Sequence, residues 1–114
     1  MSANVKVSTF RDPTVCLEVV LQANQTANDA GAWVLVAGYE KKSIHIIITG
    51  NAQADLRGSN LPTKPDDAND DGVSLGTANA ANAIIEHKSP VKWMKLKTTC
   101  PGNSSVSGYL QGCP

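Results

Sequence analysis

Apolar and polar residues alternate with a period of two over several short stretches of this chain. Over residues 15–22 the odd positions are apolar, whereas Glu18 and Gln22 fall on the opposite face. Residues 43–49 are rich in β-branched side chains, and every even position is isoleucine. A period of two is that of a strand with one buried face. We therefore predict strands at both stretches, the second of them central.

Further strands are predicted where apolar or alternating stretches lie between turn-forming residues, at residues 32–36, 53–58, 73–76, 91–99 and 106–110. Residues 78–85 are rich in Ala, which favours helix, and in Asn, which does not, so we expect them to be irregular or weakly extended. Residues 59–72 hold four aspartates and two prolines, which predicts a long polar loop. About seven or eight short strands without a helical period predict an all-β fold, a single antiparallel β-sandwich of jelly-roll type over residues 1–114.

The length of the chain indicates a single domain, and its charge limits the kinds of partner that it can bind. The chain has 114 residues, enough for one domain, and its 10 Lys and Arg balance 10 Asp and Glu. Neutrality disfavours nucleic acid and anionic membranes as partners, so we expect a protein or a neutral surface. Met1 to Phe10 lack the basic and apolar segments of a secretion signal, so the chain is expected to stay in the cytosol of its producer.

Three cysteines, Cys16, Cys100 and Cys113, leave at least one thiol unpaired within the chain. A Cys100–Cys113 bridge is one alternative. A simple hairpin that turns at residues 101–103 would instead pair position 100 with about position 106. Buried or unreacted thiols are therefore the favoured interpretation.

The polar loop contains a partial match to a calcium-binding loop. Asp67, Asn69 and Asp71 place oxygen ligands at alternate positions, and Gly72 follows them. The position that should supply a bidentate Glu is Ala78, and no helical pattern flanks the loop. We therefore expect a solvated acidic tip, with no metal and no cofactor.

No motif for catalysis occurs in the sequence. His45 and His87 lie in different kinds of segment, and neither has a Ser or Cys in a local motif for nucleophilic catalysis. His45 alternates with isoleucines and is expected on the surface of a sheet. The three glutamates are scattered, so their spacing indicates no carboxylate pair. We expect no enzyme and no catalytic residue.

A group of lysines surrounds one tryptophan near the C-terminus. Such a group could stack single-stranded nucleic acid or a sugar, but lysines are more often the solvated face or the protected edge of a strand. The group comprises Trp93, Lys88, Lys92, Lys95 and Lys97. Aromatic residues are common anchors of interfaces, and the candidates here are Trp33, Tyr39, Trp93 and Tyr109.

The order of these segments resembles the small β-sandwich structural proteins of tailed bacteriophages, which decorate capsids or join head, tail and fibre parts. The resemblance covers most of residues 33–112 and rests on Gly38-Tyr39, residues 43–49, Leu56-Arg57-Gly58-Ser59-Asn60, Asp71-Gly72, Val73-Ser74-Leu75-Gly76, residues 91–97 and residues 106–112. The chain departs from the pattern by the insertion of residues 61–70, by lysines in place of arginines, and by a terminal Cys113-Pro114.

This resemblance implies a non-enzymatic virion protein, assembled in the host cytoplasm. The most concrete form is a capsid decoration or cement protein that binds the major capsid protein as a small homo-oligomer, taken as a trimer. A tail, fibre or head-to-tail adaptor component is the alternative within the virion. A carbohydrate-binding module with Trp93 or Tyr109 as its stacking platform, or a β-sandwich with a bacterial regulatory role, are alternatives of other classes.

Overall fold

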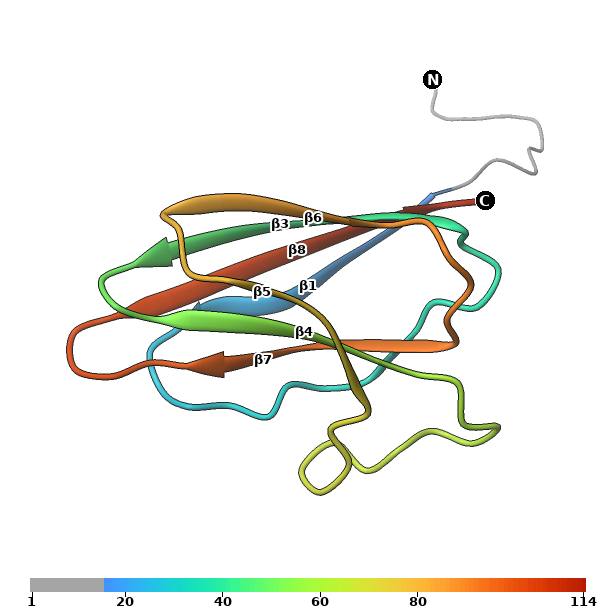
Figure 1. Ribbon diagram of the computed structural model, residues 1–114, viewed down its shortest axis with the longest axis horizontal. Helices are drawn as coiled ribbons and strands as arrows, with labels where there is room; N and C mark the ends of the chain where they lie inside the picture. The colour runs from blue at the N-terminus through green and yellow to red at the C-terminus, as the bar shows by residue number, and fades with distance from the viewer. Residues whose placement is uncertain (1–15) are drawn as a thin grey trace.

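The computed structural model describes residues 16–114, so the predicted strand position Val15 and the segment without a secretion signal lie outside the described residues. The described chain contains eight strands (Figure 1). Their bounds are β1 Leu17–Gln25, β2 Val34–Leu35, β3 Lys41–Thr49, β4 Gln53–Ser59, β5 Val73–Ala78, β6 Asn82–His87, β7 Trp93–Thr99 and β8 Ser105–Cys113.

The strands form two four-stranded antiparallel sheets with the orders β1-β8-β3-β6 and β2-β7-β4-β5. Strands equally far from the middle of the series pair with each other: β1 with β8, β2 with β7, β3 with β6 and β4 with β5. This is the pairing of one long hairpin wound into two sheets, which defines a jelly roll. The predicted all-β sandwich of jelly-roll type is confirmed. The long polar loop is also present, between β4 and β5.

The core lies between the two sheets and follows the predicted alternation. The even positions of β3 are buried, as are those of β4 from Ala54 to Gly58. Apolar side chains of β7 and β8 meet them from the two sheets. The residues with no exposed surface are Ile44, Ile46, Ala54, Leu56, Met94, Leu96 and Val106, together with Lys95.

Residues 78–85, expected to be irregular or weakly extended, are extended over most of their length, and the irregular part is confined to residues 79–81. β5 continues to the buried Ala78, and after a short exposed connection β6 begins at Asn82. β6 pairs along β3 from Asn82 to His87 and packs Ile85 against the core. These sheet contacts outweigh the weak local preference of an Ala- and Asn-rich sequence, because strand formation depends on packing and pairing.

The pairing of Cys16 with Cys113 differs from the expectation, whereas Cys100 is a buried thiol as expected. β7 and β8 belong to different sheets, so residues 101–103 do not turn a simple hairpin. The pairing of Leu17 with Gly112 brings the flanking Cys16 and Cys113 together, and these two form a disulfide with a Cα–Cα distance of 4.4 Å. Cys100 is a free, buried thiol. The bridge therefore joins the two ends of the described chain, which lie at the same end of the sandwich (Figure 1).

Gln22 does not share a face with Glu18 as the alternation predicted. The pairing of β1 with β8 shifts register between Val20 and Gln22, which is a β-bulge. Gln22 is therefore buried, and its amide donates to the Leu96 carbonyl at 2.9 Å and to the Asp29 carboxylate at 2.8 Å. The bulge thus turns Gln22 into the sandwich, where two hydrogen bonds satisfy its buried amide group.

Candidate functional site

The outer face of the sheet β1-β8-β3-β6 carries one row of large side chains that crosses all four strands. Val20 pairs with Tyr109, Tyr109 with His45, and His45 with Ile84. Directly opposed residues of neighbouring strands lie side by side on the same face. We call this row of four residues the outer row.

The outer row is unusually apolar for an exposed surface. Val20, Tyr109 and Ile84 are 57%, 43% and 65% exposed, and Ile47 adds a further exposed apolar side chain. The next row along the strands is polar and consists of Glu18, Gln111, Ser43 and Glu86. The sheet thus presents an apolar row with a polar border, the arrangement that marks many protein interfaces.

His45 occupies the middle of the outer row. It is exposed, as predicted for a residue on a sheet surface, and its ring lies 6.5 Å from that of Tyr109. Its Nε2 atom is 3.3 Å from the Asn82 side-chain oxygen. A shallow hollow of about 450 Å³ follows the outer row and its polar border. A hydrogen-bonding group therefore lies in the middle of an otherwise apolar contact surface.

The four aromatic interface candidates lie in different environments. Trp33 is 4% exposed and belongs to the interior, so it offers no surface to a partner. Trp93 is half-buried, and its indole N–H donates to the Leu61 carbonyl at 3.0 Å. Tyr39 is half-buried and lies within the connection from β2 to β3. Of the four, Tyr109 lies on the sheet face as an exposed ring, and the structure does not gather them into one site.

Trp33 is buried because the polar loop between β4 and β5 folds over it. Its indole N–H lies 3.1 Å from the Asp70 carbonyl and 3.3 Å from that of Asp66, and its backbone N–H donates to the Asp67 carboxylate at 2.8 Å. The ammonium of Lys95 lies 4.9 Å from the centre of the Trp33 ring. The loop folds over these two side chains, while most of its own residues, including Asp66, Ala68 and Asn69, are exposed as its composition predicted.

Lys95 is fully buried, which corrects its assignment to a solvated face. Its Nζ atom donates to the carbonyls of Asp67 and Asp70 at 2.8 and 3.1 Å and to the Asp71 carboxylate at 3.2 Å. Lys97 donates to the same carboxylate at 2.7 Å. One buried ammonium thus satisfies three oxygens of the loop, which is the condition under which a charge can be buried.

The carboxylates of the loop are engaged by protein groups. Hydrogen bonds from Lys97 and then Lys95 lower the pKa of Asp71, and the backbone N–H of Trp33 is the main cause of a lowered pKa at Asp67. Backbone N–H groups lower the pKa of Asp66. Within residues 16–114 no group of three or more His, Cys, Asp or Glu side chains is arranged to hold a metal ion.

A second buried lysine was missed by the sequence patterns. Lys42 is 2% exposed, and its ammonium donates to the carbonyls of Tyr39, Glu40 and Ser89 at 2.7, 3.0 and 3.2 Å. Burial lowers the pKa of Lys42, and Glu40 opposes that effect. Burial and the nearby Lys42 charge also lower the pKa of His87, against a hydrogen bond with Ser89. The signal that could have found Lys42 is its even position, on the buried face of β3.

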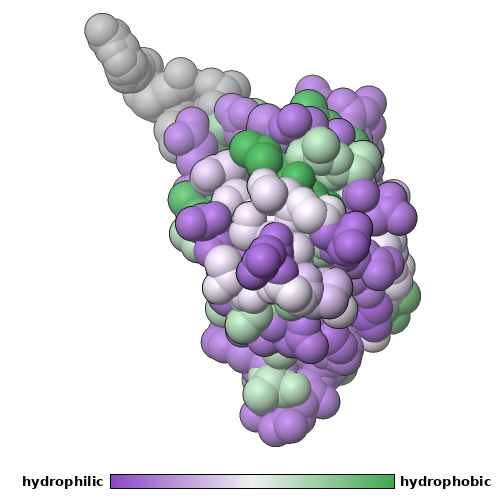
Figure 2. All heavy atoms as spheres, turned by 90° about the vertical axis from the view of Figure 1, so that its left-hand side faces the viewer, coloured by the Kyte–Doolittle hydropathy of each residue, from purple (hydrophilic) through white to green (hydrophobic). Residues whose placement is uncertain are grey.

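The end of the sandwich opposite the chain termini has a different character from the outer row. Figure 2 faces this end, which is formed by the connections β3–β4, β5–β6 and β7–β8. Its surface is mainly hydrophilic or intermediate, and hydrophobic residues appear on it in small separate groups. The row across one whole sheet is therefore the stronger candidate for contact with another protein.

Comparisons with known proteins identify no relative: no protein-family model, curated protein or solved structure matches the chain. Within residues 16–114 no helix is long and apolar enough to span a membrane.

Proposed function

We propose that this chain is a non-enzymatic structural protein of a tailed-phage virion, most concretely a capsid decoration protein. It docks on the assembled shell through the outer row and its polar border, and it acts as a small homo-oligomer. The observation that carries the proposal is the exposed apolar row across all four strands of one sheet. Such a surface is costly to leave in water and gains by being covered.

The size of the face supports a role in docking. Strands spaced about 4.8 Å apart and about 30 Å long give a four-stranded face of roughly 600 Å², close to the ~800 Å² that each partner buries in a standard interface. The longest strands of this sheet have nine residues each. A rigid face of this area needs no flexible segment to make a specific contact.

Two further features support a virion. Jelly rolls are a recurrent fold of viral capsid proteins, although fold alone does not determine function. The Cys16–Cys113 bridge suits a protein that works in an oxidising environment, such as the exterior of a released particle. Both features agree with the resemblance of the sequence to small phage structural proteins.

The test is co-sedimentation of the purified protein with expanded capsids of the phage that encodes it. The wild-type chain should pellet with the capsids, and Ile84→Glu in the outer row should reduce the bound fraction at least tenfold. Val73→Glu is the matched control, because Val73 is 69% exposed on β5 of the other sheet. Binding that both variants retain, or absence of the chain from purified virions by mass spectrometry, would refute the proposal.

Copy number separates decoration from the alternative of a tail, fibre or adaptor component. Shells offer hundreds of equivalent positions, whereas a vertex or tail ring offers about a dozen or fewer. Quantitative mass spectrometry of virions against the major capsid protein measures this number. A count in the hundreds is the expected result, and a count near a dozen would move the protein to the tail or a vertex.

A further inference from the structure

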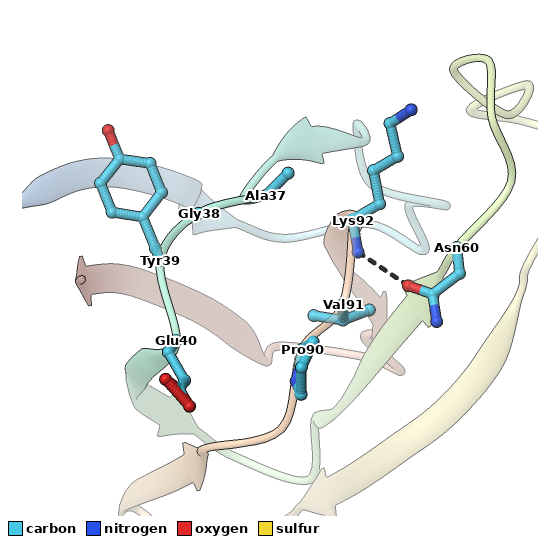
Figure 3. Close-up of a pocket in the computed structure, with 8 residues that line it drawn as sticks. All are labelled: Ala37, Gly38, Tyr39, Glu40, Asn60, Pro90, Val91 and Lys92. Atoms are coloured by element: carbon cyan, nitrogen blue, oxygen red, sulfur yellow. Dashed lines mark hydrogen bonds between the residues drawn. The ribbon is translucent and has the colours of Figure 1, made fainter.

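An open hollow lies at one edge of the sandwich, away from the outer row. Its volume is about 680 Å³, within the range of about 300–1,000 Å³ that is typical of small-molecule sites. Tyr39 and Glu40 form one side, Asn60 and Lys92 form the other, and Val91 lies between them (Figure 3). These residues come from three connections that are far apart in the sequence.

The walls of this hollow are fixed by buried groups. The Lys42 ammonium donates to the carbonyls of Tyr39 and Glu40 on one wall and to that of Ser89, beside Pro90, on the other. The first atoms of the Tyr39 side chain lie close to Gly112, where a Cβ atom would stand 3.1 Å from the Tyr39 Cβ. A site held in this way loses little conformational entropy when a ligand binds.

Several polar groups at the rim have no hydrogen-bond partner within residues 16–114. Among the described residues, nothing donates a hydrogen bond to the Glu40 carboxylate, and the Tyr39 hydroxyl has no hydrogen bond. Asn60 accepts a bond from the Lys92 backbone N–H at 2.9 Å, which leaves its Nδ2 donor free (Figure 3). An acceptor, a donor and a hydroxyl thus surround a floor that contains Val91 and Pro90.

The exposed charges at the rim balance, and the buried Lys42 ammonium behind the walls is engaged by three carbonyls. Glu40 contributes one negative charge and Lys92 one positive charge, and the Lys92 ammonium is already engaged by the Pro62 carbonyl at 2.8 Å. An anionic or cationic ligand would therefore gain little net attraction. A neutral ligand that carries both donors and acceptors on an apolar frame matches these groups best.

We propose that this hollow binds a neutral saccharide. A sugar hydroxyl both donates and accepts, so it can pair with the Glu40 carboxylate and the Asn60 amide. The C–H face of the ring can cover the apolar surface of Tyr39, Pro90 and Val91. The site lies apart from the outer row and does not depend on the proposed virion role.

The test is titration of the ¹⁵N-labelled full-length protein with glucose, galactose, mannose and N-acetylglucosamine, followed by NMR. At least one sugar at ~10 mM, well above a Kd near 1 mM, should shift amide signals of residues 37–40, 60 and 90–92 in a saturable way. Glu40→Gln and Asn60→Asp should each weaken binding at least fivefold. Asn60→Asp keeps the acceptor for the Lys92 N–H, removes the donor and adds one negative charge.

Asn79→Asp is the matched control for Asn60→Asp, because Asn79 is exposed in the β5–β6 connection, outside the hollow, and its substitution should leave the affinity unchanged. Unshifted spectra with all four sugars would overturn the proposal, as would equal weakening by Asn79→Asp. Binding of glucuronate without any neutral sugar would overturn the choice of a neutral ligand. Co-sedimentation with capsids reports separately on the outer row.

Discussion

Lys95 shows how one side chain can fold a loop. Its ammonium is fully buried beneath residues 66–71, where it satisfies two carbonyls and one carboxylate. A buried charge is tolerated only when it is paired and hydrogen-bonded, so the loop oxygens and the lysine depend on each other. The acidic composition of the loop is thus matched by a cation from the sheet below it.

We predict that Lys95→Met destabilises the protein by about 2–4 kcal/mol, because it removes the donor to the Asp67 carbonyl and the ion pair with Asp71 at a fully buried position. Urea denaturation followed by tryptophan fluorescence measures the change. Lys97→Met is the control, since Lys97 is 40% exposed and shares Asp71, and it should cost under about 1 kcal/mol. Equal losses for the two variants would show that burial of Lys95 is not the cause.

Acidification should destabilise the protein in two steps. The folded pKa of His87 lies below its ordinary value of 6.5. The unfolded chain therefore takes up this proton first, and stability falls as pH drops from about 6.5. The lowered pKa values of Asp67 and Asp71 cause a second loss below their ordinary value of 3.8, down to their folded pKa values.

Denaturation midpoints between pH 2 and 8 measure both steps. His87→Gln should remove the upper step and leave the lower one. His45→Gln should leave both, since His45 is exposed on the outer row. If His87→Gln still loses stability as pH falls from about 6.5, a group other than His87 causes that loss.

At the scale of elements, the return of the polar loop into β5 depends on one glycine. Gly72 has a φ of +59°, and a Cβ atom there would lie 2.3 Å from the Gly58 carbonyl oxygen and 2.8 Å from the Trp33 ring. Gly102 has nearly the same φ of +58° with no atom within 4 Å of such a Cβ. Alanine at either position would have the same backbone strain, but only at Gly72 would it also clash with neighbouring atoms.

We predict that Gly102→Ala costs about 1 kcal/mol from the left-handed backbone alone. Gly72→Ala should cost at least about 2 kcal/mol more, because the neighbouring atom is backbone and cannot move freely. Thermal and urea denaturation of the two variants give the comparison. Equal costs would mean that the loop shifts readily to admit the methyl group.

The elements also show which features can be inferred from sequence alone. β3 was predictable because isoleucine fills the even positions 44, 46 and 48, and a period of two indicates a half-buried strand. β6 was not, because pairing with β3 and contacts of Ile85 stabilise a segment that has weak strand preference of its own. The sequence predicts a solvated face for Lys95, because its partners come from a distant connection that no local pattern reveals, whereas the even position of Lys42 in β3 does indicate burial.

The candidate site was even less predictable. Tyr109 was singled out as an aromatic anchor, and the structure places it in the outer row. Val20 and Ile84 were missed, because the row exists only through the pairing of four strands that are not consecutive in the chain. Register between distant strands is a property of the whole fold and not of any one segment.

At the scale of the molecule, the disulfide closes a segment with a sequence separation of 97. A disulfide that closes a longer loop removes more entropy from the unfolded chain. For a loop of about 100 residues the entropic model gives a stabilisation of up to about 4.7 kcal/mol. Cys16→Ser should therefore lower the melting temperature by several degrees in non-reducing buffer. Differential scanning calorimetry measures the shift.

Reductant supplies the internal comparison for this prediction. Dithiothreitol should lower the melting temperature of the wild-type chain to that of Cys16→Ser and leave the variant unaffected. Cys100→Ser changes the free buried thiol and should stay sensitive to reductant. A wild-type chain whose melting temperature is unmoved after complete reduction would contradict a stabilising bridge.

The same bridge makes residues 16–113 a covalent ring, with the Cα atoms at its junction 4.4 Å apart. A ring has no obligatory first residue. A circularly permuted gene that opens the exposed β5–β6 connection at residues 79–81, and joins Pro114 to Cys16 through an added Gly/Ser linker, should encode the same jelly roll. In that permutant β6 would be synthesised first. The strands would then leave the ribosome in a different order and still form the same fold.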